Sequence, residues 1–369
     1  MPPRTIVVTG ADGFVGQNLR LRLSELQGYE VRPIGRGDDP EAWRAAVAGA
    51  DLVVHLAGVN RPPDPAEFSG NADSIRSLTD AMDAAGKPLP VILASSAKAA
   101  DPSPYGISKK EAEDALLEHA ARSGASAAIY RLPNIFGKWA RPNYNSGVAT
   151  FCHNVARELP INVHDHAAPL TLVYVDDVID AFIAQMEQGF QTGFHEVPPI
   201  YETSVGEVAD IIRGFRADRS DNMIANVGTG LLRALYATYV SYLPPEEFSY
   251  SIESHRDPRG AFSEMLKTRQ AGQFSYFTAH PGVTRGGHYH HTKTEKFLIV
   301  HGEARFRFRH VMTGETHEVL TSGDKPVVVE TVPGWTHDVT NVGEGVMVSL
   351  LWANELFDRQ RPDTIAMKV

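Results

Sequence analysis

The sequence predicts an α/β domain built on a doubly wound parallel sheet, followed by a smaller all-β barrel. Apolar β-rich runs alternate with helical stretches in the first part of the chain, which is typical of repeated βαβ units. Residues 243–250 (LPPEEFSY) then interrupt the helical pattern as a linker does, and only short β-rich runs follow. We therefore expect one domain over residues 1–243 and another over residues 251–369.

Composition limits the classes of partner. A chain of 369 residues is too long for one compact core, so two domains are expected. The formal net charge of -10 disfavours binding to nucleic acid or to anionic membranes. The single cysteine, Cys152, fits a reducing compartment, and no apolar run approaches the roughly 20 residues that span a bilayer. We expect a cytoplasmic protein without membrane insertion.

The first strand and the turn after it are predicted to bind a dinucleotide. Residues 5–8 (TIVV) form a short β-rich run, the motif GADGFVG follows, and leucines then recur at helical spacing. Glycine lets the chain approach a pyrophosphate closely, while a helix N-terminus offers unpaired N–H groups and a partial positive charge. The predicted cofactor contacts of this turn are Gly10, Gly13, Phe14, Val15 and Gly16.

The second strand predicts which nicotinamide cofactor is bound. It covers YEVRPI and ends close to Arg36, where an NAD-binding protein usually has an acid for the ribose hydroxyls. The guanidinium of Arg36, with Arg32 nearby, suits the additional 2′-phosphate of NADPH. In the alternative, both arginines are solvated and Asp38 or Asp39 contacts the ribose.

The next two strands are predicted at residues 51–60 (DLVVHLAGVN) and 90–99 (PVILASSAKA). Helical stretches at residues 71–85 and 108–122 follow them, so the strands belong to a parallel sheet that is covered on both faces. Ligands of such sheets bind at the C-terminal ends of the strands. The predicted cofactor contacts after the first of these two strands are Leu56 and Ala57.

Tyr105 and Lys109 are the candidate catalytic pair. The segment YGISK places them four residues apart at the start of a helix, so both side chains lie on one face. An ammonium group beside a phenol stabilises the phenolate, which lowers the phenol pKa from its ordinary value of about 10. Tyr105 is therefore predicted to exchange a proton with a carbonyl oxygen during hydride transfer.

Together these motifs resemble the extended short-chain dehydrogenase/reductase family, which has a Rossmann fold, over about residues 1–240. The resemblance assigns the catalytic serine to Ser96, with Ser95 as the alternative, the proton donor to Tyr105 and the lysine to Lys109. It also makes Asn134, in the segment RLPNIFG, a candidate substrate contact.

Two departures from that family affect the predicted site. Only nine positions separate Ser96 from Tyr105, which is short for the family. Leu170 stands near the position where the family often has an arginine, so the contact to the diphosphate must come from elsewhere. The candidates for the missing positive charge are Lys138, Arg141 and Arg157, each of which is otherwise an ordinary surface residue.

The second domain carries a predicted metal site. Nine of the 15 histidines lie after residue 250, and His288 and His290 project to the same side of a strand because side chains alternate. The order His288, His290, Glu295 and, much later, His337 resembles the metal motifs of the cupin family over about residues 250–369. Three imidazoles and a carboxylate suit one divalent metal, with Zn²⁺ preferred over iron, manganese or nickel.

A second resemblance gives His288 a different role. DPRGAFSE (257–264) and GVTRGGHYHH (282–291) are similar to segments of the sugar-nucleotide 3,5-epimerases, which are cupins that act on 4-keto-6-deoxyhexoses. In that comparison His288 is the catalytic base and Arg259 contacts the substrate. A metal ligand cannot freely abstract a proton, so His288 is either ligand or base. In the second case, the remaining metal ligands are His290, Glu295 and His337.

Nearly the whole chain resembles the bifunctional enzymes of capsular polysaccharide assembly that prepare the precursor of UDP-N-acetyl-L-fucosamine. The segments RLPNIFGKWARPNYNSGVATFC, SYLPPEEFSY and HTKTEKF carry this resemblance. It implies that the cupin epimerises C3 of a UDP-2-acetamido-2,6-dideoxy-4-ketohexose. NADPH reduction of C4 in the first domain then gives UDP-2-acetamido-2,6-dideoxy-L-talose. A homodimer through the cupin is also implied.

Three alternatives to this two-step reaction remain. In the first, only reduction is catalysed and the cupin is a metal-stabilised dimerisation module. In the second, the chain is a redox-sensing regulator that binds NADP without chemistry. In the third, the cupin is an iron-dependent dioxygenase fused to a reductase.

Overall fold

The structure, a computed structural model, describes residues 2–35, 38–220, 222–252, 255–257, 260–262, 266–268, 272–355 and 360–369. The chain divides into two compact units, Met1–Arg141 with Leu170–Glu202 and Pro142–Pro169 with Thr203–Val369. The second unit therefore includes helices from the first predicted domain, and the domains 1–243 and 251–369 stay a prediction. Among the described helices, none has the length and apolar character needed to cross a membrane.

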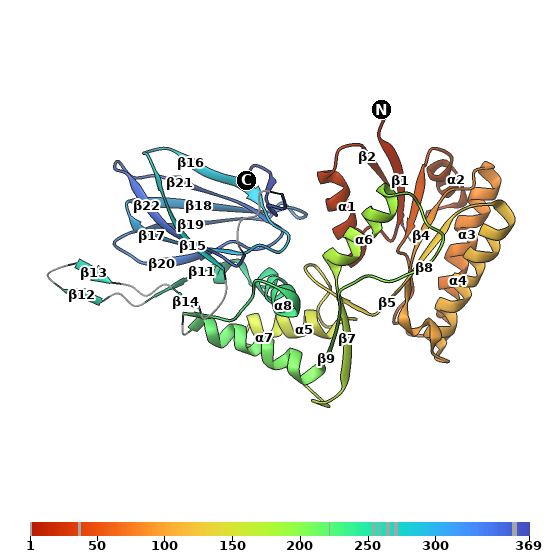
Figure 1. Ribbon diagram of the computed structural model, residues 1–369, viewed down its shortest axis with the longest axis horizontal. Coiled ribbons are helices and arrows are strands. Elements are labelled where there is room, and N and C mark those ends of the chain that lie inside the picture. The colour runs from red at the N-terminus through yellow and green to blue at the C-terminus, as the bar shows by residue number, and fades with distance from the viewer. Residues whose placement is uncertain are drawn as a thin grey trace. The chain divides into compact units, whose positions relative to one another are not determined.

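The first unit is built on a parallel sheet with the strand order β2-β1-β3-β4-β5-β8 (Figure 1). The strands are β1 (Arg4–Thr9), β2 (Tyr29–Ile34), β3 (Leu52–His55), β4 (Val91–Ser96), β5 (Ala127–Leu132) and β8 (Gly193–His195). The chain goes from β1 to β2 on one side and then to β3 on the other, so the strand order reverses between β1 and β3. The carboxyl ends of the strands at such a reversal are where these sheets bind ligands.

Helices cover both faces of this sheet. One face carries α1 (Phe14–Glu25) and α6 (Val175–Glu187), and the other carries α2 (Pro40–Ala48), α3 (Gly70–Ala85) and α4 (Pro104–Ser123) (Figure 1). All residues of β3 are buried, and so is every residue of β1 except the first, as a sheet covered on both sides requires. The predicted doubly wound parallel sheet is confirmed. A smaller sheet joins β6 (Asn134–Phe136), β7 (Pro169–Tyr174) and β9 (Ile200–Ser204).

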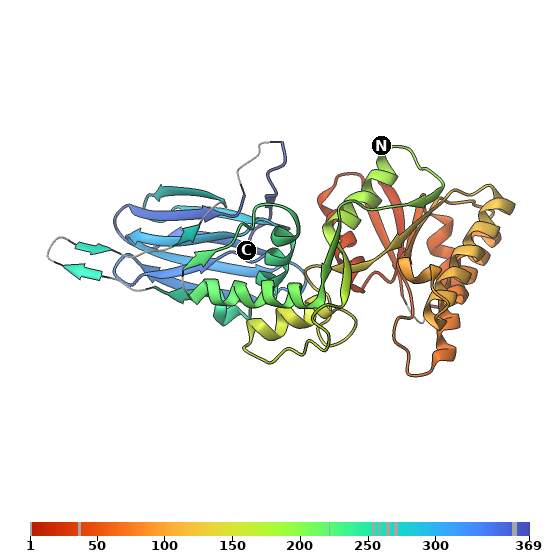
Figure 2. The ribbon, with the colours of Figure 1, turned by 60° about the horizontal axis from the view of Figure 1, so that its bottom comes forward.

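The second unit begins with helices that pack against one another. They are α5 (Gly147–Ala156), α7 (Val205–Ser220) and α8 (Gly230–Ser241), seen in yellow to green in Figure 2. The ring of Phe215 on α7 lies 5.1 Å from that of Tyr236 and 5.8 Å from that of Tyr239, both on α8. Short strands form two further pairs, β10 (Met223–Ile224) with β14 (Lys267–Thr268) and β12 (His255–Asp257) with β13 (Gly260–Phe262).

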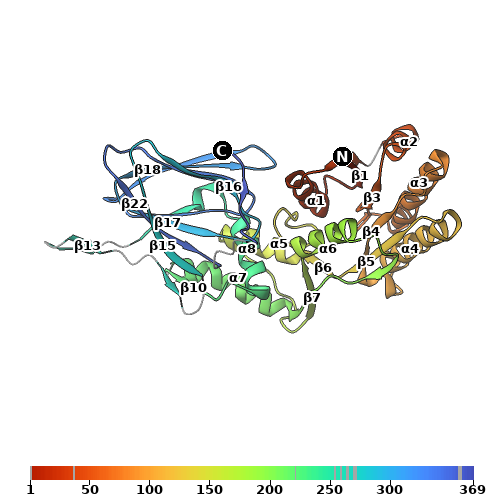
Figure 3. The same cartoon turned by 45° about the horizontal axis from the view of Figure 1, so that its top comes forward.

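The rest of the second unit consists of antiparallel sheets, as predicted for an all-β fold (Figure 3). One sheet has the order β11-β20-β17-β22-β15 and the other the order β19-β18-β21-β16-β23. Successive strands mostly alternate between the two sheets, as in a cupin-like jelly roll. The strands are β11 (Ser249–Ser251), β15 (Gln273–Ala279), β16 (Thr284–Tyr289), β17 (Glu295–His301), β18 (Glu303–His310), β19 (Thr316–Ser322), β20 (Val327–Glu330), β21 (Trp335–Asn341), β22 (Met347–Ala353) and β23 (Ile365–Ala366).

The segment predicted to be a linker, residues 243–250, is held in place by two buried side chains, and its role as a boundary between domains stays a prediction. Leu243 is 4% exposed and Phe248 is 0% exposed. The ring of Phe248 meets those of Phe308 and Trp335 at centroid distances of 5.6 and 5.0 Å. Burying a phenylalanine side chain stabilises a fold by about 1.5–3 kcal/mol, so Phe248 anchors this segment to the strands beside it. The chain thus passes from α8 into β11 without a flexible tether.

Candidate functional site

The glycine turn after β1 depends on close backbone contacts. Gly10 has a left-handed φ of 65°, and a Cβ there would lie 2.8 Å from the backbone nitrogen of Ala57. A Cβ on Gly16 would lie 2.4 Å from the carbonyl oxygen of Gly10. Helix α1 begins at Phe14, so the N–H groups of its first turn have no partner within the helix. The predicted turn and helix N-terminus therefore come together in the arrangement that holds a pyrophosphate.

A chain of hydrogen bonds fixes the loop after β3 against this turn. The backbone N–H groups of Leu56 and Ala57 both donate to Thr9 Oγ1 at 3.1 Å. Because its oxygen already accepts two hydrogens, the Thr9 hydroxyl donates its own to His55 Nδ1 (3.1 Å), and His55 Nε2 donates to Ser74 Oγ (3.2 Å). Burial lowers the pKa of His55 to about 3, so this imidazole stays neutral at neutral pH.

Tyr105 and Lys109 lie in the first turns of α4, next to the end of β4. Lys109 is 6% exposed and donates from Nζ to the carbonyl oxygen of Ala94 at 3.0 Å. Burial lowers the pKa of Lys109 to about 8, against the opposing charge of Glu113. Burial also raises the pKa of Tyr105, against a hydrogen bond with Ser96. The predicted lowering of the Tyr105 pKa by Lys109 is therefore wrong, because burial of the phenol outweighs the hydrogen bond that opposes it.

The short spacing between Ser96 and Tyr105 is accommodated by a tight turn. The 3₁₀ helix η2 (Ala97–Ala100) follows β4 directly, and Ser96 Oγ caps it by accepting a hydrogen bond from the Lys98 backbone at 3.2 Å. Gly106 then lets α4 approach that turn, because a Cβ there would lie 2.3 Å from the carbonyl oxygen of Lys98. Ser96 and Tyr105 still meet through a side-chain hydrogen bond.

The alternative serine, Ser95, takes part in a buried charged cluster. Its hydroxyl donates to Glu113 Oε1 at 2.5 Å, and Glu113 is 0% exposed. Arg131 donates to both oxygens of the same carboxylate, at 3.0 Å from Nε and 2.6 Å from Nη2. Because the Ser95 hydroxyl is taken up by this carboxylate, the structure supports Ser96 as the serine of the site.

Sequence reasoning missed the asparagines that join the loop after β3 to α4. Asn71 accepts a hydrogen bond from the backbone of Val59 at 2.8 Å and donates to Ser108 Oγ at 2.9 Å. The Tyr105 hydroxyl donates to Asn60 Oδ1 at 3.4 Å. The only signal that could have found Asn60 is its place at the end of the strand segment 51–60, since neither asparagine belongs to a motif.

The residues predicted to contact the substrate have different surroundings. Lys138 is 1% exposed and pairs through Nζ with Asp176 at 2.7 Å, so the expectation of a surface residue is wrong. Its positive charge is already balanced by that carboxylate. Asn134, Arg141 and Arg157 are exposed. Two further predicted residues lie outside the described part of the chain, Arg36 and Arg259.

The predicted metal ligands converge in the second unit. His288 lies on β16, His290 just after it, Glu295 at the start of β17 and His337 on β21. One nitrogen or carboxylate oxygen from each of the four lies within 4.8 Å of the others. A register shift after Gly286 places His288 opposite His337 on the neighbouring strand. Segments that are distant in the sequence thus bring four donor atoms together.

Backbone carbonyls fix the orientation of two of these histidines. His290 Nδ1 lies 2.6 Å from the carbonyl oxygen of Asp363, and His337 Nδ1 lies 3.4 Å from that of Trp335. A carbonyl only accepts, so both imidazoles carry a hydrogen on Nδ1. Their Nε2 atoms lie 3.2 and 3.6 Å from Glu295 Oε2. In the neutral tautomers, lone pairs therefore face a carboxylate oxygen.

The protonation states of the cluster suit a cation. Burial, with the charges of His337 and His290, lowers the pKa of His288 to about 3. Burial also lowers the pKa of His337. Burial alone would raise the pKa of Glu295, but the two neighbouring histidines hold it well below its ordinary value. Neutral imidazoles and an ionised carboxylate are the forms that bind metal, so the donor set fits a divalent ion.

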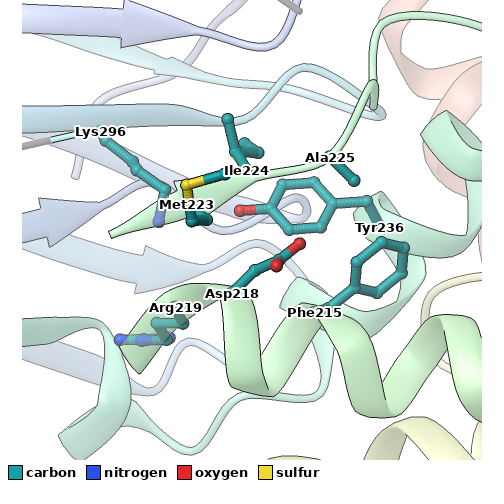
Figure 4. Close-up of a pocket in the computed structure, with 8 residues that line it drawn as sticks. All are labelled: Phe215, Asp218, Arg219, Met223, Ile224, Ala225, Tyr236 and Lys296. Carbon is teal, nitrogen blue, oxygen red and sulfur yellow. The ribbon is translucent and has the colours of Figure 1, made fainter. Parts of the chain in front are cut away.

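A second buried charged cluster ties α7 to the β-rich part of the same unit. Glu330, at the end of β20, pairs with Arg219 Nη1 at 2.7 Å and with Lys296 Nζ. Figure 4 shows Arg219 and Lys296 lining a small pocket together with Tyr236. The ring of Tyr250 lies under both cations, 4.5 Å from Arg219 Cζ and 5.1 Å from Lys296 Nζ. This cluster has the character of a structural core, and no site motif falls in it.

Fold and site together define an enzyme of the short-chain dehydrogenase/reductase class. A glycine turn follows β1 at the reversal of a parallel sheet, Ser96 ends β4 of the same sheet, and Tyr105 and Lys109 lie on the helix after it. The chain belongs to the NAD dependent epimerase/dehydratase family, which matches residues 6–195. Residues 255–365 match the polysaccharide biosynthesis C-terminal domain.

Similar proteins support this assignment over the full length. The chain is 51% identical, over 99% of its length and 98% of the relative, to a UDP-2-acetamido-2,6-beta-L-arabino-hexul-4-ose reductase of Pseudomonas aeruginosa. The solved structure of the capsular polysaccharide assembling protein CapF of Staphylococcus aureus matches 99% of this chain and 100% of that one, with 42% identity and a TM-score of 0.68. The structure of RMD from Pseudomonas aeruginosa with NADPH, at 24% identity and a TM-score of 0.51, covers 58% of this chain and 82% of that one and supports the fold alone.

Proposed function

We propose that this chain converts a UDP-linked 4-keto-6-deoxy amino sugar in two steps. The predicted second domain, residues 251–369, epimerises C3 of a UDP-2-acetamido-2,6-dideoxy-4-ketohexose. The predicted first domain, residues 1–243, reduces C4 with NADPH to give UDP-2-acetamido-2,6-dideoxy-L-talose. The observation that carries the reductase step is the full-length similarity to the Pseudomonas aeruginosa reductase, combined with Ser96, Tyr105 and Lys109 at and after the end of β4 in the same sheet. The observation that supports the epimerisation step is the cluster of His288, His290, Glu295 and His337.

In the reduction, NADPH supplies the hydride, and the chain supplies orientation and a proton. The turn at Gly10 and Gly16 and the N-terminus of α1 hold the pyrophosphate. The raised pKa of Tyr105 keeps its phenol protonated at neutral pH, ready to donate to the C4 oxygen. Ser96 orients that phenol, and Lys109 places a buried positive charge beside the site.

For the epimerisation, we propose that His288, His290, Glu295 and His337 hold one Zn²⁺. With hydrogens on Nδ1, the Nε2 atoms of His290 and His337 face Glu295 Oε2 at 3.2 and 3.6 Å. A cation shared by these acceptors, whether a metal ion or a proton, removes the repulsion between them, and Zn²⁺ is the cation proposed. The metal ion would polarise a carbonyl and stabilise the enolate that forms when the C3 proton leaves. Once C4 is reduced, C3 loses its acidity and the new configuration is fixed.

His288 is assigned here as a ligand rather than as the base. Its low pKa leaves the imidazole neutral, which either role requires, but its nitrogen lies among the other donor atoms of the cluster. A separate group then removes the C3 proton. His288→Gln distinguishes the two roles, since a ligand variant loses bound zinc and a base variant retains it on the other three residues.

The remaining parts of the proposal concern organisation. We keep the predicted domains, 1–243 for NADPH reduction and 251–369 for epimerisation, and place the reaction in the cytoplasm, which the single buried Cys152 supports. A homodimer through the second domain is supported by the exposed apolar residues Phe274 and Tyr276 on β15. Size-exclusion chromatography with light scattering tests the dimer.

Incubating the UDP-4-keto sugar in D2O, with and without NADPH, tests both steps. We expect deuterium at C3 without the cofactor, loss of that exchange in His337→Gln, and normal exchange in His280→Gln, a control at an exposed histidine outside the cluster. Tyr105→Phe should keep the exchange and slow NADPH oxidation by about 10²–10⁴. If the wild type shows no exchange, epimerisation is refuted, and the alternative in which only reduction is catalysed is favoured.

A further inference from the structure

Residues 360–369, named here the clamp segment, pack against the strand that carries the first predicted metal ligand. In β23, Ala366 pairs with His288 of β16 and Ile365 pairs with Tyr289. The Met367 backbone donates to the carbonyl oxygen of Gly287 at 2.8 Å. The clamp segment therefore adds an edge strand beside the strand that carries His288. The sequence contains no motif that predicts this pairing.

Within the clamp segment, the carboxylate of Asp363 binds the loop that follows β16. Its Oδ1 accepts from the backbone of His291 at 2.9 Å, and its Oδ2 accepts from the backbones of Thr292 and Lys293 at 2.8 and 2.7 Å. The Thr292 hydroxyl donates to the same Oδ2 at 3.1 Å. Four donors from three successive residues thus converge on one carboxylate, and the path of this loop is set by it.

The main chain of Asp363 orients the metal ligand at the start of that loop. Its carbonyl oxygen accepts from His290 Nδ1 at 2.6 Å, which places the hydrogen on Nδ1 and leaves the lone pair of Nε2 directed at Glu295. Asp363 has a φ of 37°, which non-glycine residues rarely adopt and which aspartate and asparagine tolerate better than most. The contacts of the carboxylate hold the residue in this conformation, and so aim its carbonyl.

We propose that Asp363 is the positioning residue of the metal centre. Its carboxylate fixes the loop of residues 291–293, and its carbonyl fixes the tautomer and the ring orientation of His290. This inference rests on the metal site proposed above. Partners of this kind, which hold a ligand without touching the metal, typically change metal affinity by about 10- to 100-fold when they are lost.

A merely structural role for Asp363 predicts a different outcome. In that case its removal lowers the stability of the fold and leaves the affinity of the folded protein for metal, and the tautomer of His290, unchanged. Asp363→Asn serves as a second variant, because asparagine tolerates the same backbone conformation and keeps one acceptor oxygen for the loop. Arg309→Ala is the matched control. Arg309 lies on β18 and donates to the Lys368 carbonyl of the clamp segment, so the variant removes a different contact of the same segment.

Two measurements on the full-length protein test the proposal. Zn²⁺ affinity is measured on metal-stripped protein by competition with a chelating dye, and the His290 tautomer by NMR of ¹⁵N-histidine-labelled protein, with circular dichroism as a check of folding. We expect Asp363→Ala to bind Zn²⁺ about 10- to 100-fold more weakly and to lose the single Nδ1–H tautomer. Asp363→Asn should show a smaller change, and Arg309→Ala none.

The outcomes separate this proposal from the proposed metal site. A folded Asp363→Ala protein with the affinity and the tautomer of the wild type overturns the positioning role. If the wild type itself binds no Zn²⁺, the metal site is refuted. The tautomer measurement alone then decides whether Asp363 positions His290. Loss of the tautomer in Asp363→Ala still supports the positioning of His290, and its retention refutes it.

Discussion

Replacing Glu330 with glutamine removes the carboxylate that lies between two buried cations. Arg219 is 8% exposed and Lys296 is 3% exposed, so neither can recover its lost partner from water. Removing one member of a buried ion pair typically costs about 3–5 kcal/mol, because the partner charge remains buried. Glutamine has nearly the volume of glutamate, so no cavity adds to this cost. We expect α7, β17 and β20 to open more readily by about that amount.

Hydrogen exchange followed by mass spectrometry is the suitable assay. A chain of two compact units need not unfold in one step, whereas exchange in peptides from α7, β17 and β20 reports the local free energy of opening. The matched control is Glu318→Gln, because Glu318 is half exposed and lies 3.9 Å from Arg305. Such surface pairs contribute about 0–1 kcal/mol. If Glu330→Gln lowers the free energy of opening no more than Glu318→Gln does, the carboxylate of Glu330 does not stabilise the buried cations as argued.

The pH dependence of the same peptides gives an independent check. Burial would raise the pKa of Glu330, but Arg219 and Lys296 lower it below its ordinary value. A carboxyl group with a depressed folded-state pKa stabilises the fold above its unfolded pKa, near 4.3, and this contribution is lost as pH falls through the folded value. In the wild type, protection of these peptides from hydrogen exchange should therefore fall below about pH 4. In Glu330→Gln, the part of this fall that comes from protonation of Glu330 should be absent.

Three further predictions concern the first unit. Gly16→Ala should abolish NADPH binding measured by fluorescence titration, because its Cβ would lie 2.4 Å from a backbone oxygen, and unchanged binding would contradict this close contact. Ser96→Ala should lower kcat by about 10²–10³, whereas Ser95→Ala should chiefly lower the free energy of unfolding by about 1–3 kcal/mol; the reverse result would exchange their roles. Since the pKa of Lys109 is about 8 and the reaction needs its positive charge, kcat/KM should fall as pH rises above about 8, and a profile flat to pH 10 would exclude that need.

Much of the first fold was predictable because its signals are local. The turn GADGFVG, the apolar runs of β1 and β3 and the helical spacing after them are each contained in a short window. The His/Glu cluster was predictable for a similar reason, since three of its four members, His288, His290 and Glu295, fall within eight residues of the sequence. The alternation of side chains on a strand then requires His288 and His290 to face the same side.

The supporting residues could not be predicted because their partners are distant in the sequence. Glu113 lies on a helix like any surface acid, and only the pairing of β4 with β5 brings Arg131 to it. Lys138 resembled a surface lysine until the fold placed Asp176 beside it. The lowered pKa expected for Tyr105 failed for the same reason, because burial raises the pKa of the phenol and the residues around it, Phe68 and Asn60, are distant in the sequence.

Asp363 also makes the proposed metal centre depend on the last ten residues of the chain. A variant shortened before residue 360 would keep all four predicted ligand side chains but would lack the carbonyl that accepts from His290 Nδ1. Shortening the chain at that point is therefore expected to weaken the proposed metal site without removing a ligand.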